Sequence, residues 1–113
     1  MSDVVKNYIN GDWVLSGSGE TFASVNPATE ETLAIVTRSN GQDVANAVAA
    51  AKNAYDKWRL TPAPRRGEIL YRVAEILLQR KEDIARLATQ EMGKILAETP
   101  GDVQEAIDMA YFM

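Results

Sequence analysis

Short apolar runs alternate with turn residues over the first forty positions of the chain. Tyr8-Ile9 and Trp13-Val14 flank the dipeptide Asn10-Gly11. Asn-Gly between apolar residues favours a two-residue type I′ turn, because both central positions of that turn need a positive φ. The pattern therefore predicts a hairpin with strands at residues 7–9 and 12–14.

A second pair of apolar, β-branched runs follows a predicted loop at residues 15–20. These runs cover residues 21–25 and 32–37, and an Asn26-Pro27 turn separates them. β-branched and aromatic residues favour strands, whereas Asn and Pro favour turns. We expect the first 37 residues to form a small antiparallel meander.

The spacing of apolar residues changes from that of a strand to that of a helix at Ser39. Two capping boxes fit this boundary, Ser39 with Gln42 and Asn40 with Asp43, and the sequence leaves both open. The apolar positions that follow share one helical face. They are Val44, Val48, Ala51, Tyr55 and Trp58.

Three further helices are predicted after this one. Pro62 and Pro64 end the first and begin the second, since proline fits the first turn of a helix. Arg80-Lys81 followed by two acidic residues indicates that one helix ends and the next begins there. Gly93 suits the position directly after a helix end. The last helix begins near Thr99. The apolar stripes are Ile69, Leu70, Val73, Ile76 and Leu77, then Ile84, Leu87 and Ala88, then Val103, Ala106, Ile107, Ala110 and Met113.

The last predicted helix ends on Tyr111-Phe112-Met113 without a glycine, a basic turn or a polar exit. We therefore expect the chain to be part of a longer protein. The predicted organisation is a strand segment at residues 1–38 and a helical segment at 39–113, together one incomplete domain of the α+β class.

Composition excludes several classes of function. The 113 residues carry a net charge of −4, which argues against nucleic acid as a partner. Cysteine and histidine are both absent, which removes disulfides, thiol catalysis and the usual general base. Neither a signal peptide nor a membrane span is indicated, so we expect a cytoplasmic protein.

Candidate binding motifs are weak when taken from the residues alone. Gly17-Ser18-Gly19 lacks the third glycine and the following helix of a dinucleotide fingerprint, so we interpret it as a loop. Gly93-Lys94 lacks the rest of a phosphate-binding loop. Arg65-Arg66 could grip an anion, but pairing with Glu68 one turn away is the favoured interpretation.

Acidic and aromatic residues give no stronger signal. The pairs Glu91 with Asp102 and Glu105 with Asp108 could do acid–base work, but solvated helix faces are favoured. Three aromatic residues are interpreted as core and hairpin packing, because no basic patch flanks them. These are Trp13, Tyr55 and Trp58.

The order of the motifs resembles the amino-terminal part of the aldehyde dehydrogenase superfamily over nearly the whole chain. No single piece decides this, but the full order at these spacings is specific. The matching residues are Tyr8-Ile9-Asn10-Gly11 with Trp13, Asn26-Pro27-Ala28-Thr29 with Glu31, Asp43-Val44 with Ala47-Val48 and Ala50-Ala51, Trp58, Arg66, Leu70, Glu91-Met92-Gly93-Lys94, and Gly101-Asp102-Val103 with Ala106.

This resemblance implies the start of a Rossmann-like cofactor domain in an enzyme that oxidises an aldehyde with NAD or NADP. A cysteine thiolate would attack the carbonyl, and an activated water would release the acid. The residues for that chemistry lie beyond Met113, so we assign no catalytic and no cofactor-binding residue here. A semialdehyde substrate and a homodimeric or homotetrameric enzyme are implied for the full length.

Two positions depart from the family's pattern. Glu30 stands where the family often has glycine, and if that position needs a left-handed φ, glutamate there costs about 1 kcal/mol. Pro100 stands where the family often continues a helix, so we expect a helix start shifted to Thr99 or a kink. In relatives, main-chain oxygens hold a monovalent cation, and the matching positions are Val36 and Asp102. A stand-alone interaction or dimerisation module, hiding its apolar end against a second copy, is the alternative.

Overall fold

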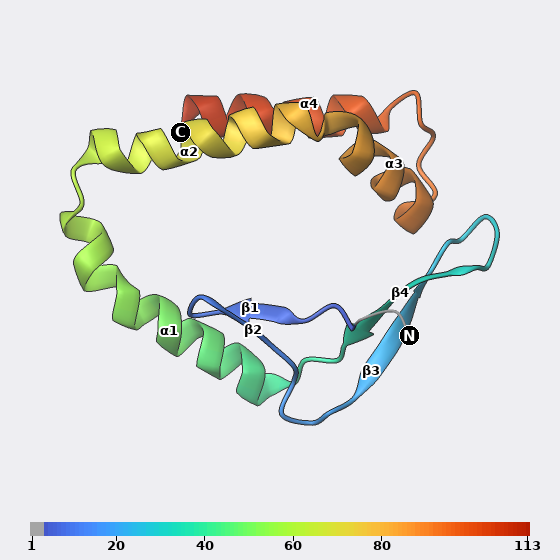
Figure 1. Cartoon of the computed structure of the whole chain (residues 1–113), viewed down its shortest axis with the longest axis horizontal. Coiled ribbons are helices and arrows are strands. Elements are labelled where there is room, and N and C mark those ends of the chain that lie inside the picture. Colours follow the sequence, from blue (N-terminus) through green and yellow to red (C-terminus); the bar gives the residue numbers. More distant parts are fainter. Residues whose placement is uncertain (1–3) are drawn as a thin grey trace. The chain divides into compact units, whose positions relative to one another are not determined.

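The structure, a computed structural model, describes residues 4–113 and begins with two short hairpins (Figure 1). Strands β1 (Asn7–Ile9) and β2 (Asp12–Val14) pair antiparallel. Asn10 and Gly11 between them have φ values of 54° and 88°, as a type I′ turn requires. The predicted hairpin and its turn are confirmed.

Strands β3 (Thr21–Val25) and β4 (Thr32–Thr37) form the second antiparallel pair at the predicted positions. The predicted meander is wrong, because the two hairpins are separate sheets and β2 does not pair with β3. The loop between β2 and β3 is held by side-chain hydrogen bonds instead of a tight turn. Val5 forms a parallel bridge with Val36 of β4.

The Asn26-Pro27 turn reverses the chain between β3 and β4. The side chain of Asn26 accepts a hydrogen bond from the backbone N–H of Ala28 at 2.9 Å, and its carbonyl accepts one from Glu30 at 2.8 Å. Glu30 has a φ of 62°, in the left-handed region that disfavours residues with a Cβ atom. The structure therefore confirms that Glu30 stands at a position with a left-handed φ, where the expected conformational cost applies.

Four helices follow where the sequence predicted them, namely α1 (Gly41–Leu60), α2 (Ala63–Gln79), α3 (Lys81–Met92) and α4 (Thr99–Phe112). Proline stands in the first turn of both α2 and α4, so the predicted start at Thr99 is confirmed. Gly93 ends α3 with a φ of 76°, and its N–H donates to the carbonyl of Thr89. Across residues 4–113 no helix combines the length and apolar character needed to cross a bilayer.

The described chain divides into two compact units. The strand unit contains residues 4–25 and 31–60, which hold all four strands and α1. The helical unit contains residues 26–30 and 61–113, which hold the Asn-Pro turn and the remaining three helices. Each unit has its own packing and is described by itself.

The core of the helical unit forms where α4 packs against α2 and α3 (Figure 1). Ile107 of α4 is 1% exposed. Thr99 is also fully buried, and its hydroxyl lies 3.0 Å from that of Thr89. The buried apolar residues are Ala74, Ala85, Val103 and Ile107, with Leu77, Ile84 and Ala110 packed against them.

The predicted stripe of α2 is mostly not part of this core. Ile69, Val73 and Ile76 are exposed, whereas Ala74 is completely buried. The small side chain of Ala74 packs in the core beside the partly buried Leu77 of the same helix. The interpretation of Tyr55 and Trp58 as core residues is also wrong for the described chain, since both are exposed.

Gly93 is also constrained by a close neighbour within the helical unit. A Cβ atom placed on Gly93 would lie 3.0 Å from Cγ of Pro27 in the Asn-Pro turn. The end of α3 therefore approaches this turn in a way that leaves no room for a side chain at position 93.

Candidate functional site

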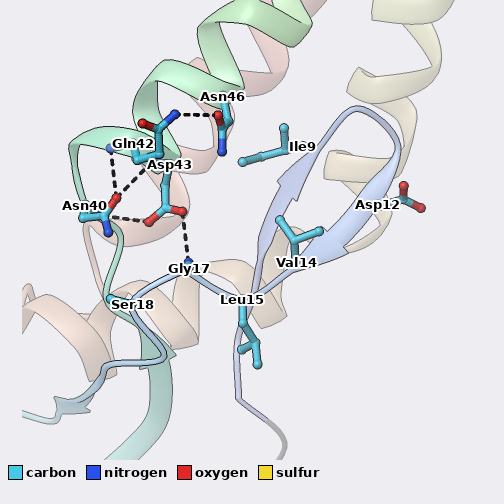
Figure 2. Close-up of a pocket in the computed structure, with 10 residues that line it drawn as sticks. All are labelled: Ile9, Asp12, Val14, Leu15, Gly17, Ser18, Asn40, Gln42, Asp43 and Asn46. Atoms are coloured by element: carbon cyan, nitrogen blue, oxygen red, sulfur yellow. Dashed lines mark hydrogen bonds between the residues drawn. The ribbon is translucent and has the colours of Figure 1, made fainter.

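A pocket of about 600 Å³ in the strand unit lies between the first hairpin and the start of α1 (Figure 2). Ile9, Val14 and Leu15 supply an apolar wall from the hairpin and the loop that follows it. Asn40, Gln42 and Asp43 supply a polar wall from the first turn of α1. A polar and an apolar wall around one hollow are the usual properties of a ligand site, so the pocket is the first candidate.

Asp43 is the centre of the polar wall. Its carboxylate accepts a hydrogen bond from the Ser16 hydroxyl at 2.5 Å, from the backbone N–H of Asn40 at 2.8 Å and from the backbone N–H of Gly17 at 3.3 Å. Asn40 returns the contact, because its side-chain oxygen accepts from the N–H of Gln42 at 2.9 Å and of Asp43 at 3.1 Å. Of the two predicted capping boxes, the structure contains Asn40 with Asp43.

The loop between β2 and β3 is fastened to α1 through Ser16. The N–H of Ser16 donates to the Thr37 hydroxyl at 2.9 Å, and both residues are buried. The Ser16 hydroxyl lies 3.0 Å from that of Ser18. The sequence identified Ser16 and Ser18 only as part of a loop, although the spacing of Asn40 and Asp43 indicated that a carboxylate would stand at the helix start.

The contacts of Asp43 fix its charge. The Ser16 hydroxyl, and then the N–H of Asn40, hold the pKa of the Asp43 carboxyl below its ordinary value of 3.8, against a smaller opposing effect of burial. Hydrogen bonds to the ionised form stabilise it, so Asp43 is a carboxylate at neutral pH. A general acid or base needs a pKa near the working pH. The hydrogen bonds of Asp43 lower its pKa and so move it further from neutral pH.

The polar wall of the pocket therefore has a structural role. The oxygens of Asp43 are engaged by Ser16, Asn40 and Gly17, and no buried side-chain nitrogen or oxygen among the described residues lacks a partner. The function of these contacts is to hold the hairpin, the loop and α1 in one arrangement.

The described residues do not fit a dinucleotide. The Gly17-Ser18-Gly19 loop leads into strand β3, whereas a pyrophosphate needs a glycine-rich turn that opens a helix. The first turn of α1 does follow a strand, but the Asp43 carboxylate already occupies it. A second anion there would meet like charge.

The Lys94 ammonium is paired with acidic side chains of α4 and of the segment before it. Its ammonium donates to both oxygens of Asp102 at 2.8 Å and 2.7 Å and lies 3.8 Å from Glu98. The hydrogen bond to Asp102 raises the pKa of Lys94 above its ordinary value of 10.5. Gly93 therefore ends α3, and Lys94 forms an ion pair. This arrangement is not that of a phosphate-binding loop.

Three further candidates make contacts within their own helix or hairpin. Arg65 pairs with Glu68 at 2.9 Å, as the sequence favoured. Asp108 accepts a hydrogen bond from Gln104 at 2.8 Å on the surface of α4. Trp13 packs on Tyr8 with ring centroids 4.9 Å apart, which confirms hairpin packing for that residue.

The two cation positions lie in different units, Val36 on β4 and Asp102 in the first turn of α4. The Asp102 carboxylate binds Lys94. The described residues contain no group of three acidic side chains that could hold a metal ion. Main-chain ligation by Val36 and Asp102 stays a prediction.

Comparison with known proteins gives a consistent result. Residues 13–113 match the Aldehyde dehydrogenase family. The chain is 46% identical over 113 residues to the alpha-ketoglutarate semialdehyde dehydrogenase of Haloferax volcanii, covering 99% of this chain and 23% of that protein. It is 47% identical over 108 residues to malonate-semialdehyde dehydrogenase 2 of Geobacillus kaustophilus, covering 96% of this chain and 22% of that protein.

Solved structures agree in fold. A 3,6-anhydro-L-galactose dehydrogenase in complex with NAP superposes with a TM-score of 0.93 at 28% identity, over 97% of this chain and 23% of that one. Betaine aldehyde dehydrogenase from Staphylococcus aureus in complex with NAD⁺ gives 0.91 at 28% identity, over 96% of this chain and 22% of that one.

The two hairpins and four helices thus match the amino-terminal part of solved dehydrogenase structures. The chain belongs to the aldehyde dehydrogenase family and spans less than a quarter of the length of these relatives.

Proposed function

We propose that this chain is the amino-terminal portion of an NAD(P)-dependent dehydrogenase that oxidises a semialdehyde to a carboxylic acid. The observation that carries the proposal is the identity of 46% and 47% to two enzymes named for semialdehydes, over nearly the whole chain. The resemblance of residues 91–96 and 101–105 also favours the semialdehyde-oxidising branches of the family.

The chemistry belongs to the rest of the protein. In the proposed reaction a cysteine forms a thiohemiacetal, hydride passes to the nicotinamide, and water releases the acid. Neither a cysteine nor a histidine is present in these 113 residues. The chain alone is therefore proposed to be inactive, and no catalytic or cofactor-binding residue is assigned to it.

The contribution of the chain is structural. Leu60 is 72% exposed and Phe112 is 84% exposed. Exposed apolar side chains on helices suit surfaces that pack on other parts of a protein. The strand segment 1–38 and the helical segment 39–113 are proposed to complete one cofactor-binding domain with the sheet that follows in the family's order.

The test is an assay of the full-length protein with malonate semialdehyde and with an uncharged aldehyde of the same carbon number, using NAD and NADP in turn. A site built for a carboxylate gains about 1.5–3 kcal/mol from charged hydrogen bonds, or roughly tenfold to a hundredfold in kcat/KM. Absence of NAD(P)H formation with every aldehyde would refute the family activity. A preference for the uncharged aldehyde would refute only the semialdehyde assignment.

The alternative is a stand-alone interaction or dimerisation module. The exposed apolar end of α4, including Phe112, favours it, because a second copy could cover that end. Sedimentation velocity of the 113-residue chain separates the two functions. A stable dimer that a Phe112→Ser change dissociates would support the module, whereas a monomer supports the enzyme portion.

Further properties of the full-length protein are proposed with the same basis. It would act in the cytoplasm as a homodimer or homotetramer. It would bind a monovalent cation through the main-chain oxygens of Val36 and Asp102. Isothermal titration of the full-length protein with sodium and potassium chloride tests the cation site, and no heat with either salt would refute it.

A further inference from the structure

We propose that Asn10 is a site of spontaneous deamidation, and that the fold directs this modification to Asn10 while it protects Asn40. The chain contains two asparagines that precede glycine, Asn10-Gly11 and Asn40-Gly41. The sequence alone gives them equal reactivity. The structure places them in opposite environments.

The chemistry needs only the protein and water. The backbone nitrogen of the following glycine attacks Cγ of the asparagine side chain, a C–N bond forms, and the side-chain nitrogen leaves as ammonia with the displaced proton. The product is a five-membered succinimide. Water then opens the ring at either carbonyl and gives aspartate or isoaspartate, so one amide and one water become one carboxylate and one ammonium, without oxidation or reduction.

Asn10 is free to react. It lies at the exposed end of the β1–β2 hairpin, and within residues 4–113 its side chain makes no hydrogen bond. The strands end at Ile9 and resume at Asp12, so the N–H of Gly11 lies outside the strand pairs. Gly11 has no Cβ to obstruct the approach, and nothing lies within 4 Å of the place where one would be.

Hydrogen bonds at the start of α1 hold Asn40 in place. Its side-chain oxygen accepts from the N–H groups of Gln42 and Asp43, and its own N–H donates to the Asp43 carboxylate (Figure 2). Ring closure would turn Cγ of Asn40 toward the nitrogen of Gly41 and break both hydrogen bonds that its side-chain oxygen accepts. Because two hydrogen bonds must open first, the reaction at Asn40 should be slower by on the order of tenfold or more.

The chain also contains an internal standard. Asn26 precedes Pro27, whose nitrogen carries no hydrogen, so the ring cannot form there by this route. Deamidation at Asn26 therefore measures only the background of direct hydrolysis.

The modification would alter the hairpin. Isoaspartate adds a backbone atom to a turn of two residues, and the new carboxylate stands two residues from Asp12. The pairing of Ile9 with Asp12, which closes the turn, would loosen, and both residues line the pocket beside α1.

The experiment incubates the whole 113-residue chain in mildly alkaline buffer, with and without denaturing urea, and follows each asparagine by peptide mapping and mass spectrometry. In native buffer, Asn10 should convert at least about tenfold faster than Asn40. In urea, the two rates should approach each other, because the capping bonds are gone. Asn26 should stay unchanged in both.

A matched variant isolates the site. Gly41→Ala has open space for the added methyl group and leaves the side-chain oxygen of Asn40 in place, so it should slow Asn40 further and leave Asn10 unaffected. Equal rates at Asn10 and Asn40 in native buffer, or a faster rate at Asn40, would overturn the proposal. A Gly41→Ala chain that loses its Asn10 conversion would also overturn it.

Discussion

Replacing Ile107 by alanine tests whether the helical unit has a core of its own. Ile107 is 1% exposed and packs with Ala74, Ala85 and Val103, where α4 meets α2 and α3. The change removes three carbon atoms, each worth about 0.8 kcal/mol of transfer free energy, or roughly 2.4 kcal/mol together. Two of the neighbours are alanines on rigid helices and fill the space poorly, so the cavity should raise the loss to about 3–4 kcal/mol.

The assay is urea unfolding of the 113-residue chain, followed by native-state amide exchange of α4 so that the helical unit is measured by itself. Ile107→Val removes one methylene group and should lower the free energy of unfolding by about 1 kcal/mol. Phe112→Ala on the same helix changes a side chain that is 84% exposed and should cost less than about 0.5 kcal/mol. If Ile107→Ala costs no more than Ile107→Val, the three helices do not form a packed core in this chain, and the reasoning is refuted.

Three other outcomes are expected. Asn40→Ala should destabilise α1 by about 1 kcal/mol and Asn40→Ser by much less, by chemical denaturation, and equal losses would show that the cap is not responsible. Glu30→Gly should stabilise the chain by up to about 1 kcal/mol, because φ at that position is 62°, and a loss of stability in thermal unfolding would contradict the strain. The folded pKa of Asp43 is lowered, so its stabilising contribution is full above 3.8 and is lost as the pH falls below that value. Acid titration by NMR should therefore release the N–H groups of Asn40 and Gly17 from protection at low pH, whereas in Asp43→Asn the same protection should not vary with pH.

Local rules predicted most of the elements. The Asn10-Gly11 turn, the prolines before α2 and α4 and the glycine after α3 all act within a few residues, so their positions could be assigned from the sequence. The pairing of β2 with β3 failed because it depends on the Ser16 contacts to Thr37 and Asp43, which lie 21 and 27 residues away.

Burial was harder to predict than secondary structure. An apolar stripe shows which face of a helix avoids water but not what covers it. On α4 the stripe was right for Val103 and Ile107, because α2 and α3 lie within the chain. On α1 the apolar positions recur at the spacing of a helix, as predicted. Val44 and Tyr55 are nevertheless exposed, because none of the described residues covers them.

The candidate site shows the same division. The helix cap at Asn40 and Asp43 was one of two predicted boxes, and the Ser39 hydroxyl of the other box contacts the Asn7 side chain instead. A loop serine has no sequence signal for such a contact. The prediction that the chain contains no catalytic residue rests on composition, since cysteine and histidine are both absent.

The approach of Gly93 to Pro27 limits how this part of the protein can change during evolution. A residue larger than glycine at position 93 meets two separate obstacles, a φ of 76° and a methyl group placed 3.0 Å from the proline ring. Shrinking Pro27 to alanine makes room but leaves the backbone conformation as it was, so no single compensating substitution reopens the position. In a library that varies both sites, position 93 should keep glycine whichever residue is selected at 27, whereas position 27 is free to vary as long as glycine stays.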